Sequence, residues 1–256
     1  MSPSLPDLPE PFRLLALEQV GSTNDEARRL AERGDARDLL VVTAESQTAG
    51  RGRRGRTWVS PAGNLHASLL IRQSGPLGRS AELGFAASAA LAGALADLVP
   101  TAAFRCKWPN DVMVVTDGST PNAKIAGMLL DSGGDGWLVL GFGVNIAVAP
   151  PPEVVMQTAT ALADLGWTGG PEPILAGFCR RFGPLLAAWR AEGFAPVRQA
   201  WLDRALGFGE TAVVRLETET LTGCFTALDD DGALVLDQGS AGCRRILAGD
   251  VFFPTS

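Results

Sequence analysis

The sequence predicts an α+β fold, in which a mixed β-sheet with flanking helices is followed by a small SH3-like β-barrel. Between residues 103 and 146, short apolar segments follow one another without long helices between them, which favours antiparallel or mixed pairing. Alanine- and leucine-rich helical patterns on either side of this stretch supply layers to cover the sheet. After Gly207 the pattern changes to short strands separated by turn residues, which is typical of a small barrel.

The first part of the chain alternates strands with helices. We expect strands at 12–20, 39–44 and 64–71, and helices at 23–34 and 79–98. Thr23 followed by Glu26 is a capping-box pattern for the first helix, and Gly34 suits the residue after its end. Ser80 is expected to cap the second helix, which stops before Pro100.

The second part of the chain supplies most of the strands. They are expected at 103–108, 112–115, 124–131, 136–146, 211–216, 220–227, 233–237 and 244–247. Residues 150–152, three prolines, interrupt regular structure. Helices follow at 174–192 and 194–206, and Pro184 predicts a break in the first of them. The segment Asp-Asp-Asp-Gly at 229–232 predicts a hairpin turn.

Composition indicates a soluble cytoplasmic protein. No apolar run approaches the roughly 20 residues needed to span a bilayer, and the first residues lack the pattern of a signal peptide. The four cysteines show no C-x-x-C spacing, so we expect reduced thiols and no membrane association. A formal net charge of −6 argues against a general nucleic-acid binder, which usually presents a basic face.

A cluster of arginines runs against this acidic background. The segment QTAGRGRRGRTW at 47–58, called here the arginine loop, holds Arg51, Arg53, Arg54 and Arg56 among glycines. Like charges this close repel one another, which favours a mobile loop unless an anion lies among them. Glycine lets backbone N–H groups approach a ligand, and arginine forks match carboxylate and phosphate groups. The loop therefore predicts a clamp for a small anionic molecule.

Two lysines lie in motifs suited to phosphate chemistry. Lys107 precedes Trp-Pro-Asn110-Asp111, so a lysine and a carboxylate flank a rigid turn. Either this is a salt bridge at a strand end, or the lysine binds phosphate beside a carboxylate that binds metal or orients an amine. Lys124 opens an apolar strand that includes Gly127. It either extends to solvent or pairs with a ligand anion.

Three further features complete the candidate set. Gly141 and Gly143 interrupt a strand before Asn145, which indicates close approach of a ligand or another backbone, and Asn145 could contact a base edge. Residues 22–24, Ser-Thr-Asn, suit either a helix cap or a ligand contact. His66 is the only histidine, so it is treated as a contact residue. The sequence has no Walker-type loop and no G-x-G-x-x-G after a strand.

In this order, these segments resemble those of biotin protein ligases, the enzymes that attach biotin to a lysine of biotin-dependent carboxylases. The matching segments are 22–24, 45–58, 107–111, 124–129 and 141–145. The resemblance implies a catalytic domain over residues 1–207, related to class II aminoacyl-tRNA synthetases and to biotin and lipoate ligases. It also implies a C-terminal SH3-like domain over residues 208–256. Some members carry an N-terminal DNA-binding domain. The resemblance begins near residue 12, and the roughly ten residues before it are too few for such a domain.

The resemblance also implies ligands and roles. ATP, Mg²⁺ and biotin would be the small molecules, and a biotin carboxyl carrier domain would be the acceptor; we expect a monomer or homodimer that does not bind DNA. Biotin contacts are implied for Ser22, Thr23, Asn24, Gln47, Gly50, Arg51, His66 and Gly127. Contacts to ATP or the adenylate are implied for Arg53, Arg54, Arg56, Trp58, Lys107, Asn110, Lys124 and Asn145. Catalytic roles fall to Arg53, Lys107, Lys124 and Asp111, and Asp111 is also the candidate Mg²⁺ ligand.

Two other functions are compatible with parts of the sequence. One is a lipoate or octanoate ligase or transferase on the same fold, although lipoate ligases lack this arginine loop. The other is a nucleic-acid binder that uses the loop as a minor-groove arm, although the rest of the chain supplies no basic surface. In the family as a whole, an aromatic residue often stands where this chain has His66, so biotin-ring packing would differ here.

Overall fold

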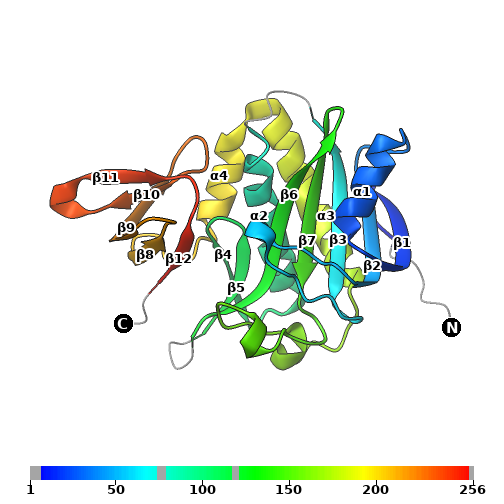
Figure 1. The fold of residues 1–256 in the computed structure, drawn as a ribbon, viewed down its shortest axis with the longest axis horizontal. Coiled ribbons are helices and arrows are strands. Elements are labelled where there is room, and N and C mark those ends of the chain that lie inside the picture. The colour runs from blue at the N-terminus through cyan, green and yellow to red at the C-terminus, as the bar shows by residue number, and fades with distance from the viewer. Residues whose placement is uncertain (1–6, 74–78, 117–120, 254–256) are drawn as a thin grey trace.

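The computed structural model describes residues 7–73, 79–116 and 121–253, and its larger part is a seven-stranded mixed sheet (Figure 1). The strand order is β1-β2-β3-β7-β6-β5-β4. These strands are β1 (Arg13–Val20), β2 (Leu40–Gln47), β3 (Leu65–Arg72), β4 (Ala103–Lys107), β5 (Asp111–Val115), β6 (Ala123–Gly134) and β7 (Trp137–Val144). β1 and β2 are parallel and the remaining neighbours are antiparallel. The predicted mixed sheet is confirmed.

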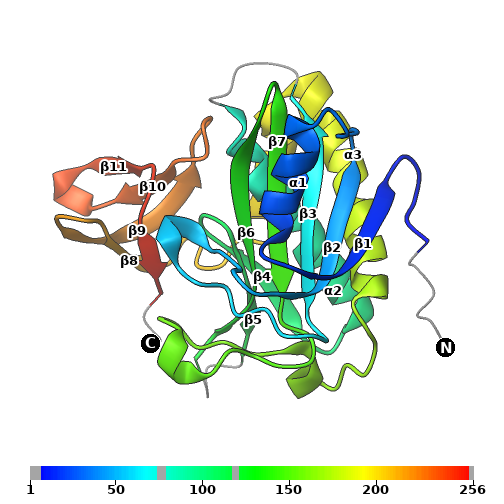
Figure 2. The same ribbon diagram turned by 45° about the vertical axis from the view of Figure 1, so that its right-hand side comes forward.

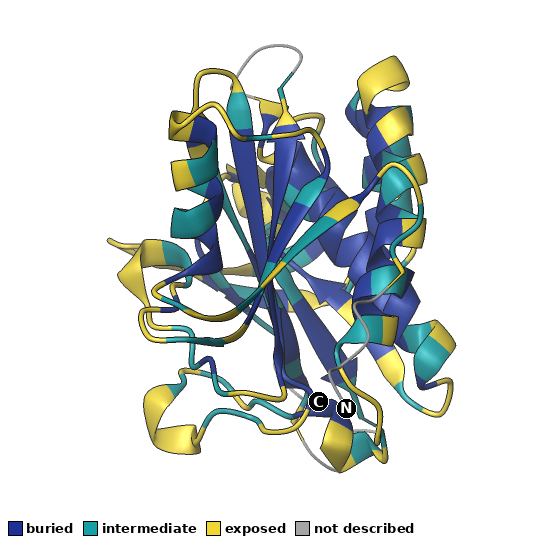
Figure 3. Ribbon diagram, turned by 90° about the vertical axis from the view of Figure 1, so that its right-hand side faces the viewer, coloured by how far each residue is buried: buried dark blue, intermediate teal, exposed yellow. Residues whose placement is uncertain are grey.

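Helices cover both faces of this sheet (Figures 1 and 2). On one face lies α1 (Thr23–Glu32), and on the other side lie α2 (Glu82–Leu98), α3 (Glu172–Glu192) and α4 (Phe194–Leu202). Figure 3 shows the buried residues gathered in the strands and on the helix surfaces that face them. Successive side chains of a strand point to opposite faces, so Leu69 of β3 joins the core under α2 and α3 while Leu70 joins the core under α1.

The C-terminal part of the chain is a five-stranded antiparallel sheet in the order β11-β10-β9-β8-β12. Its strands are β8 (Thr211–Arg215), β9 (Thr220–Leu228), β10 (Leu234–Asp237), β11 (Cys243–Ile246) and β12 (Asp250–Phe252). The turn predicted at 229–232 joins β9 to β10, and Gly232 adopts a φ of 83° there. The three-residue strand β12 was not predicted, because it is too short to show an alternating pattern.

The two sheets are joined through the strand end that carries Lys107. The indole Nε1 of Trp108 donates a hydrogen bond to the carbonyl of Gly232 at 3.0 Å. The backbone N–H of Leu206 donates to the carbonyl of Cys106 at 2.8 Å, directly before the smaller sheet begins. These bonds connect the smaller sheet to the end of β4, and β12 of that sheet lies beside the arginine loop (Figure 2).

The break predicted at Pro184 is wrong, because α3 is continuous from Glu172 to Glu192. Proline inside a helix removes one backbone donor and costs about 3 kcal/mol. Phe182 and Leu186, on either side of it, are buried in the main core, where each contributes roughly 1.5–3 kcal/mol. Burial of the helix face therefore outweighs the local penalty.

The predicted caps of the first two long helices are also wrong. Ser22 is the N-cap of α1 and makes no side-chain cap bond, and Thr23 is the first helical residue. The N-cap of α2 is Ala81, not Ser80. Because the hydroxyl of Thr23 does not cap the helix, it is available elsewhere, and it faces Gln47. Within the described ranges, no helix is long and apolar enough to cross a membrane.

Candidate functional site

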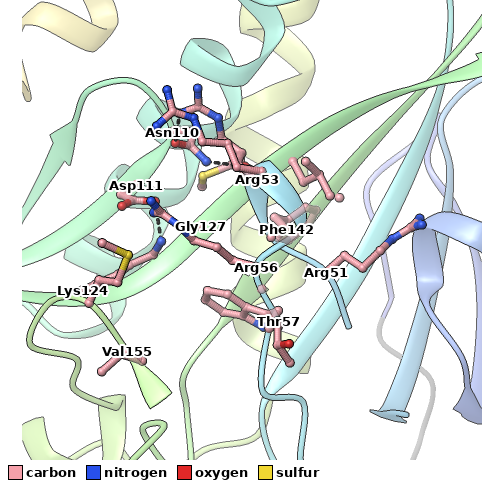
Figure 4. A pocket seen from close by; sticks show the side chains of 18 of the residues that line it. Arg51, Arg53, Arg56, Thr57, Asn110, Asp111, Lys124, Gly127, Phe142 and Val155 are labelled. Carbon is pink, nitrogen blue, oxygen red and sulfur yellow. Dashed lines mark hydrogen bonds and ion pairs between the residues drawn. The ribbon is translucent and has the colours of Figure 1, made fainter. Parts of the chain in front are cut away.

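A cavity of about 530 Å³ lies where the start of α1, the arginine loop, the ends of β4 to β7 and strand β12 converge (Figure 4). The fold therefore brings together motifs that are far apart in the sequence. Every site residue predicted from the sequence lines this cavity except Gly50 and His66.

The end of the cavity near β2 is lined by neutral hydrogen-bonding groups. Gln47 Oε1 accepts a bond from the backbone N–H of Thr23 at 2.8 Å and one from its hydroxyl at 3.1 Å. Gln47 Nε2 donates to the hydroxyl of Ser60 at 2.8 Å. These contacts fix the orientation of the glutamine amide, so this end is a preorganised, uncharged polar surface.

Asn24 connects this polar end to strand β6. Its Nδ2 donates to Asp131 Oδ2 at 2.9 Å, and its Oδ1 accepts a bond from Ser68 at 2.6 Å. A methyl group at Gly141 would collide with the Asn24 amide. The close approach indicated by this glycine is therefore that of the Asn24 side chain.

The arginine loop folds as a short hairpin beside the cavity. The backbone N–H of Trp58 donates to the carbonyl of Gly50 at 2.9 Å. The tip is a 3-10 turn, η1 (Arg53–Gly55), in which Gly55 adopts a φ of 70°. A Cβ at Gly50 would collide with the Ser60 hydroxyl and the Trp58 carbonyl. Gly50 therefore allows the two arms of the hairpin to approach each other.

Each arginine of the loop has a polar partner. The partners are Asp25 for Arg51 (2.6 Å), Asn110 for Arg53 (2.9 Å), and Asp250 for both Arg54 (3.5 Å) and Arg56 (2.8 Å). The repulsion that led us to expect a mobile loop is thus compensated by carboxylates of the protein itself. Of these four, only Arg53 has a neutral partner, so its charge remains available to an anion in the cavity. Burial lowers the pKa of Arg53, and the carboxylate of Asp111 opposes this effect.

Two lysines and one carboxylate form a connected cluster across the cavity from the polar end. Lys124 Nζ lies 2.6 Å from Asp111 Oδ1 (Figure 4). Gln157 Nε2 donates to Asp111 Oδ2 at 3.0 Å, and Lys107 Nζ donates to Gln157 Oε1 at 2.6 Å. The neutral amide of Gln157 thus bridges Lys107 and the carboxylate, whereas Lys124 pairs with Asp111 directly.

Lys107 is only 8% exposed. Burial lowers its pKa below the ordinary lysine value, Asp111 opposes that change, and the charge of Lys124 adds to it. The ring of Phe252 lies 5.3 Å from Nζ and gives a cation–π contact. Lys107 therefore loses its proton at a lower pH than an exposed lysine does.

The indole of Trp58 packs on strand β7 next to this cluster. Lys124 Nζ lies 5.5 Å from the ring, and a methyl group at Gly143 would collide with it. Gly143 is thus required because only a residue without a side chain leaves room for the indole of Trp58. In the described part of the chain, Trp58 Nε1 is buried without a hydrogen-bond partner.

Both parts of the chain match known protein families. Residues 17–142 match the biotin/lipoate A/B protein ligase family, and residues 207–253 match the biotin protein ligase C-terminal domain. The biotin–[acetyl-CoA-carboxylase] ligase of Paracoccus denitrificans is 40% identical over 246 residues, covering 93% of this chain and 99% of that protein. The chain belongs to the biotin protein ligase family.

Other biotin protein ligases show the same extent of similarity. The Mycobacterium tuberculosis biotin–[acetyl-CoA-carboxylase] ligase is 34% identical over 248 residues, covering 93% of this chain and 88% of that protein. The solved structure of the Aquifex aeolicus biotin protein ligase in complex with biotin and ATP superposes with a TM-score of 0.78 at 26% identity, covering 95% of this chain and 99% of that one. The family and the fold predicted from the sequence are confirmed.

Two of the predicted contact residues are held by the protein itself in this biotin protein ligase. His66 is 1% exposed, and its Nε2 donates to the carbonyl of Pro61 at 3.0 Å. Asn145 lines the cavity, and its amide donates to the carbonyl of Thr160 at 3.1 Å. Contacts of His66 with biotin and of Asn145 with the adenylate stay predictions. His66 does not line the cavity, so it would act on biotin through a neighbouring residue.

Gln157, Asp250 and Phe252 are among the residues that line the cavity of this ligase and that the sequence did not identify. Gln157 lies between the 3-10 turns η3 (Pro152–Val154) and η4 (Leu162–Leu165), in a segment without periodicity. Asp250 and Phe252 belong to the unpredicted strand β12. Their positions arise only from tertiary contacts, so no local pattern could have marked them.

Proposed function

We propose that this chain activates biotin with ATP as biotinyl-5′-AMP and transfers the biotinyl group to a specific lysine of a biotin carboxyl carrier domain. One observation carries the proposal: a single cavity has a neutral hydrogen-bonding end at Thr23 and Gln47, and a cationic end at Arg53, Lys107 and Lys124. Biotinyl-AMP has the same polarity, with a neutral ureido ring at one end and an acyl phosphate at the other. The biotin ligases that this chain resembles support the assignment.

In the first step, an oxygen of the biotin carboxylate attacks the α-phosphorus of ATP, and the bond to pyrophosphate breaks. The obstacle is repulsion between two anions, which preorganised cations remove. Lys124 would contact the carboxylate and the α-phosphate, and its contacts with Asp111 and the ring of Trp58 at the cationic end support this role. Lys107 and Arg53 would add charge from either side.

In the second step, the amine of the carrier lysine attacks the acyl carbonyl, an amide bond forms and AMP leaves. A free lysine has a pKa of about 10.4, so the attacking amine must first lose its proton. Asp111 is the candidate to orient this amine, since it is a carboxylate at the cationic end that already contacts Lys124 and Gln157.

Magnesium fits this site only together with ATP. In the described residues, no group of three His, Cys, Asp or Glu side chains could hold a metal ion. Mg²⁺ commonly binds one or two carboxylates together with substrate phosphates, and Asp111 could supply such a ligand. When bound, Mg²⁺ would neutralise charge on the β- and γ-phosphates.

Mass spectrometry on a carrier domain tests the proposal directly. The protein is incubated with ATP, Mg²⁺, biotin and a biotin carboxyl carrier domain, and the carrier is expected to gain one biotinyl group on one lysine. Omitting ATP is expected to abolish the gain. An unmodified carrier under complete conditions would contradict the proposed reaction.

The alternatives are a lipoate or octanoate ligase and a nucleic-acid binder. Lipoyl and octanoyl chains have no ureido group, so they would gain no hydrogen bonds at the polar end formed by Thr23 and Gln47. In the arginine loop, Arg51 is paired with Asp25 and Arg56 with Asp250, so the loop does not project as a free basic arm. Calorimetric titration with biotin, lipoate and duplex DNA is expected to give specific binding for biotin alone.

Thr23→Val is expected to weaken biotin binding about tenfold. Valine has nearly the same shape, but it removes the hydroxyl that contacts Gln47 and Ser68, at 3.1 Å and 2.7 Å. Titration calorimetry with biotin measures the change, and binding of ATP serves as the control because the substitution is at the neutral end. Equal affinity for biotin in the variant would exclude the hydroxyl from recognition.

We expect an upper pH limit for the rate of adenylation, set by loss of the proton of Lys107. Burial lowers its pKa, so the charge it supplies is fully present at low pH and is lost as the pH rises through a value below that of an exposed lysine. The rate of biotin-dependent pyrophosphate exchange is therefore expected to fall before the pH reaches about 10.4. Lys107→Arg is expected to move this limit to higher pH, because arginine stays charged.

A further inference from the structure

Strand β12 brings a carboxylate of the smaller sheet to the arginine loop. Asp250 is its first residue and pairs with Arg215 of β8. Its two carboxylate oxygens accept bonds from the guanidinium of Arg56, at 2.8 Å and 3.3 Å, and Arg54 Nη1 lies 3.5 Å away. The hydrogen bond from Arg56 lowers the pKa of Asp250, with help from the charges of Arg54 and Arg53.

This carboxylate has a specific electrostatic role. Arg51 is neutralised by Asp25 at the base of the loop, whereas Arg54 and Arg56 at the tip share Asp250. Two like charges that share one carboxylate repel each other when that carboxylate is removed. The closed form of the tip therefore depends on a group supplied by the other part of the fold (Figure 2).

We propose that Asp250 is a positioning residue that holds the arginine loop closed, and so limits escape of the acyl-adenylate before the carrier lysine arrives. The consequence for the adenylate rests on the proposed function, whereas the effect on the loop does not. The smaller sheet thereby takes part in catalysis through Arg54 and Arg56, without contacting the reacting atoms.

Hydrogen exchange on the protein alone tests the effect on the loop. The amides of Gly52 and Trp58 report closure, because they donate to Arg56 and Gly50 within the hairpin at 2.7 Å and 2.9 Å. Asp250→Asn is expected to speed their exchange at least tenfold. The matched control is Asp231→Asn, which removes another carboxylate of the same sheet that is paired with an arginine, Arg245, at 2.6 Å. It is expected to leave both amides unchanged.

Turnover tests the consequence for the adenylate. With biotin and ATP but no carrier, Asp250→Asn is expected to release several-fold more free biotinyl-AMP than the wild type or the Asp231→Asn control, and Asp250→Glu is expected to reduce the release again. Unchanged exchange in the loop would overturn the proposal whether or not the protein ligates biotin. Faster hydrogen exchange in the loop together with unchanged release of biotinyl-AMP from an active enzyme would show that the pairing of Asp250 with the loop does not retain the adenylate.

Nearly all the basic residues of this chain are arginines. The full sequence has 22 lysines and arginines, and only Lys107 and Lys124 are lysines. Both line the cavity, and both are held there, by Gln157 and by Asp111. No other residue of the chain carries a side-chain amine.

We infer that this composition makes the side chains on the surface of the enzyme resistant to its own reactive intermediate, a second inference that also rests on the proposed function. An unprotonated lysine amine attacks the acyl carbonyl of biotinyl-AMP, an amide bond forms, the bond to the phosphate oxygen breaks, AMP leaves and the amine gives up a proton to solvent. An arginine of the same charge stays protonated and does not undergo this reaction.

Synthetic biotinyl-AMP tests the inference independently of ligase activity. It is added to the protein together with a lysine-rich bystander protein, and labelled peptides of both are quantified. The bystander is expected to be labelled and the wild-type lysines are not. Arg13→Lys and Arg29→Lys introduce amines at side chains that are 58% and 55% exposed, and each is expected to gain one labelled site. Labelling of Lys107 or Lys124 at the bystander's level, or unlabelled lysine variants, would overturn the inference.

Discussion

Lys124→Ala is expected to lower biotin-dependent exchange of pyrophosphate into ATP by at least about 100-fold. The exchange reports formation of the adenylate without any contribution from the carrier. Lys124 lies at the cationic end of the cavity, with its Nζ 2.6 Å from Asp111 and 5.5 Å from the Trp58 ring. Because this position is fixed before substrates bind, its charge acts without reorganisation, which is where electrostatic catalysis is largest.

The double variant Asp111→Asn, Lys124→Ala separates two causes of that loss. Removing the lysine alone leaves the Asp111 carboxylate, with a side chain only 15% exposed, unpaired beside incoming phosphates. If that repulsion were the whole cause, the double variant would recover exchange. We expect it to stay inactive, because the positive charge itself is required. Wild-type exchange in Lys124→Ala would remove this residue from the mechanism.

The fold could be predicted from local patterns where elements are long and strongly apolar. Strands β3 and β7, which are buried almost throughout, and the alanine-rich helix α2 are such elements. Caps and breaks were less predictable, because they depend on competition with tertiary contacts. Thr23 contacts Gln47 instead of capping α1, and the burial of α3 outweighs the effect of Pro184.

The site was predictable where chemistry is concentrated in one short motif. The arginine loop and the segments around Lys107 and Lys124 combine charge, glycine and proline in unusual spacing, and they line one cavity. Gln157 and Asp250 belong to segments with no such signal. They matter because Gln157 contacts Lys107 and Asp250 contacts Arg56. The pairing of Arg54 and Arg56 with Asp250 could not be predicted for the same reason, since this carboxylate lies about 200 residues away along the chain, and the mobility of the loop stays a prediction.

Arg53→Gly is expected to release biotinyl-AMP into solution about 10- to 100-fold faster than the wild type and to label bystander proteins on many lysines. Arg53 connects the tip of the loop to the floor of the cavity through Asn110 at 2.9 Å. Of the loop arginines, it is the one whose partner within the protein is neutral. A hydrogen bond to a charged group contributes about 1.5–3 kcal/mol, which corresponds to the expected change in retention.

The two-lysine composition makes this experiment selective. With Arg53→Gly, biotin, ATP and a lysine-rich bystander, labelling is expected on the lysines of the bystander and not on those of the enzyme, so the signal measures escaped adenylate. Arg53→Lys keeps a charge without the planar fork and is expected to release less free biotinyl-AMP than the glycine variant but more than the wild type, and its new amine is itself open to acylation. Because Lys124 remains, adenylate formation should continue in all three. Retention equal to the wild type in Arg53→Gly would mean that Arg54, Arg56 and Asp250 close the loop by themselves.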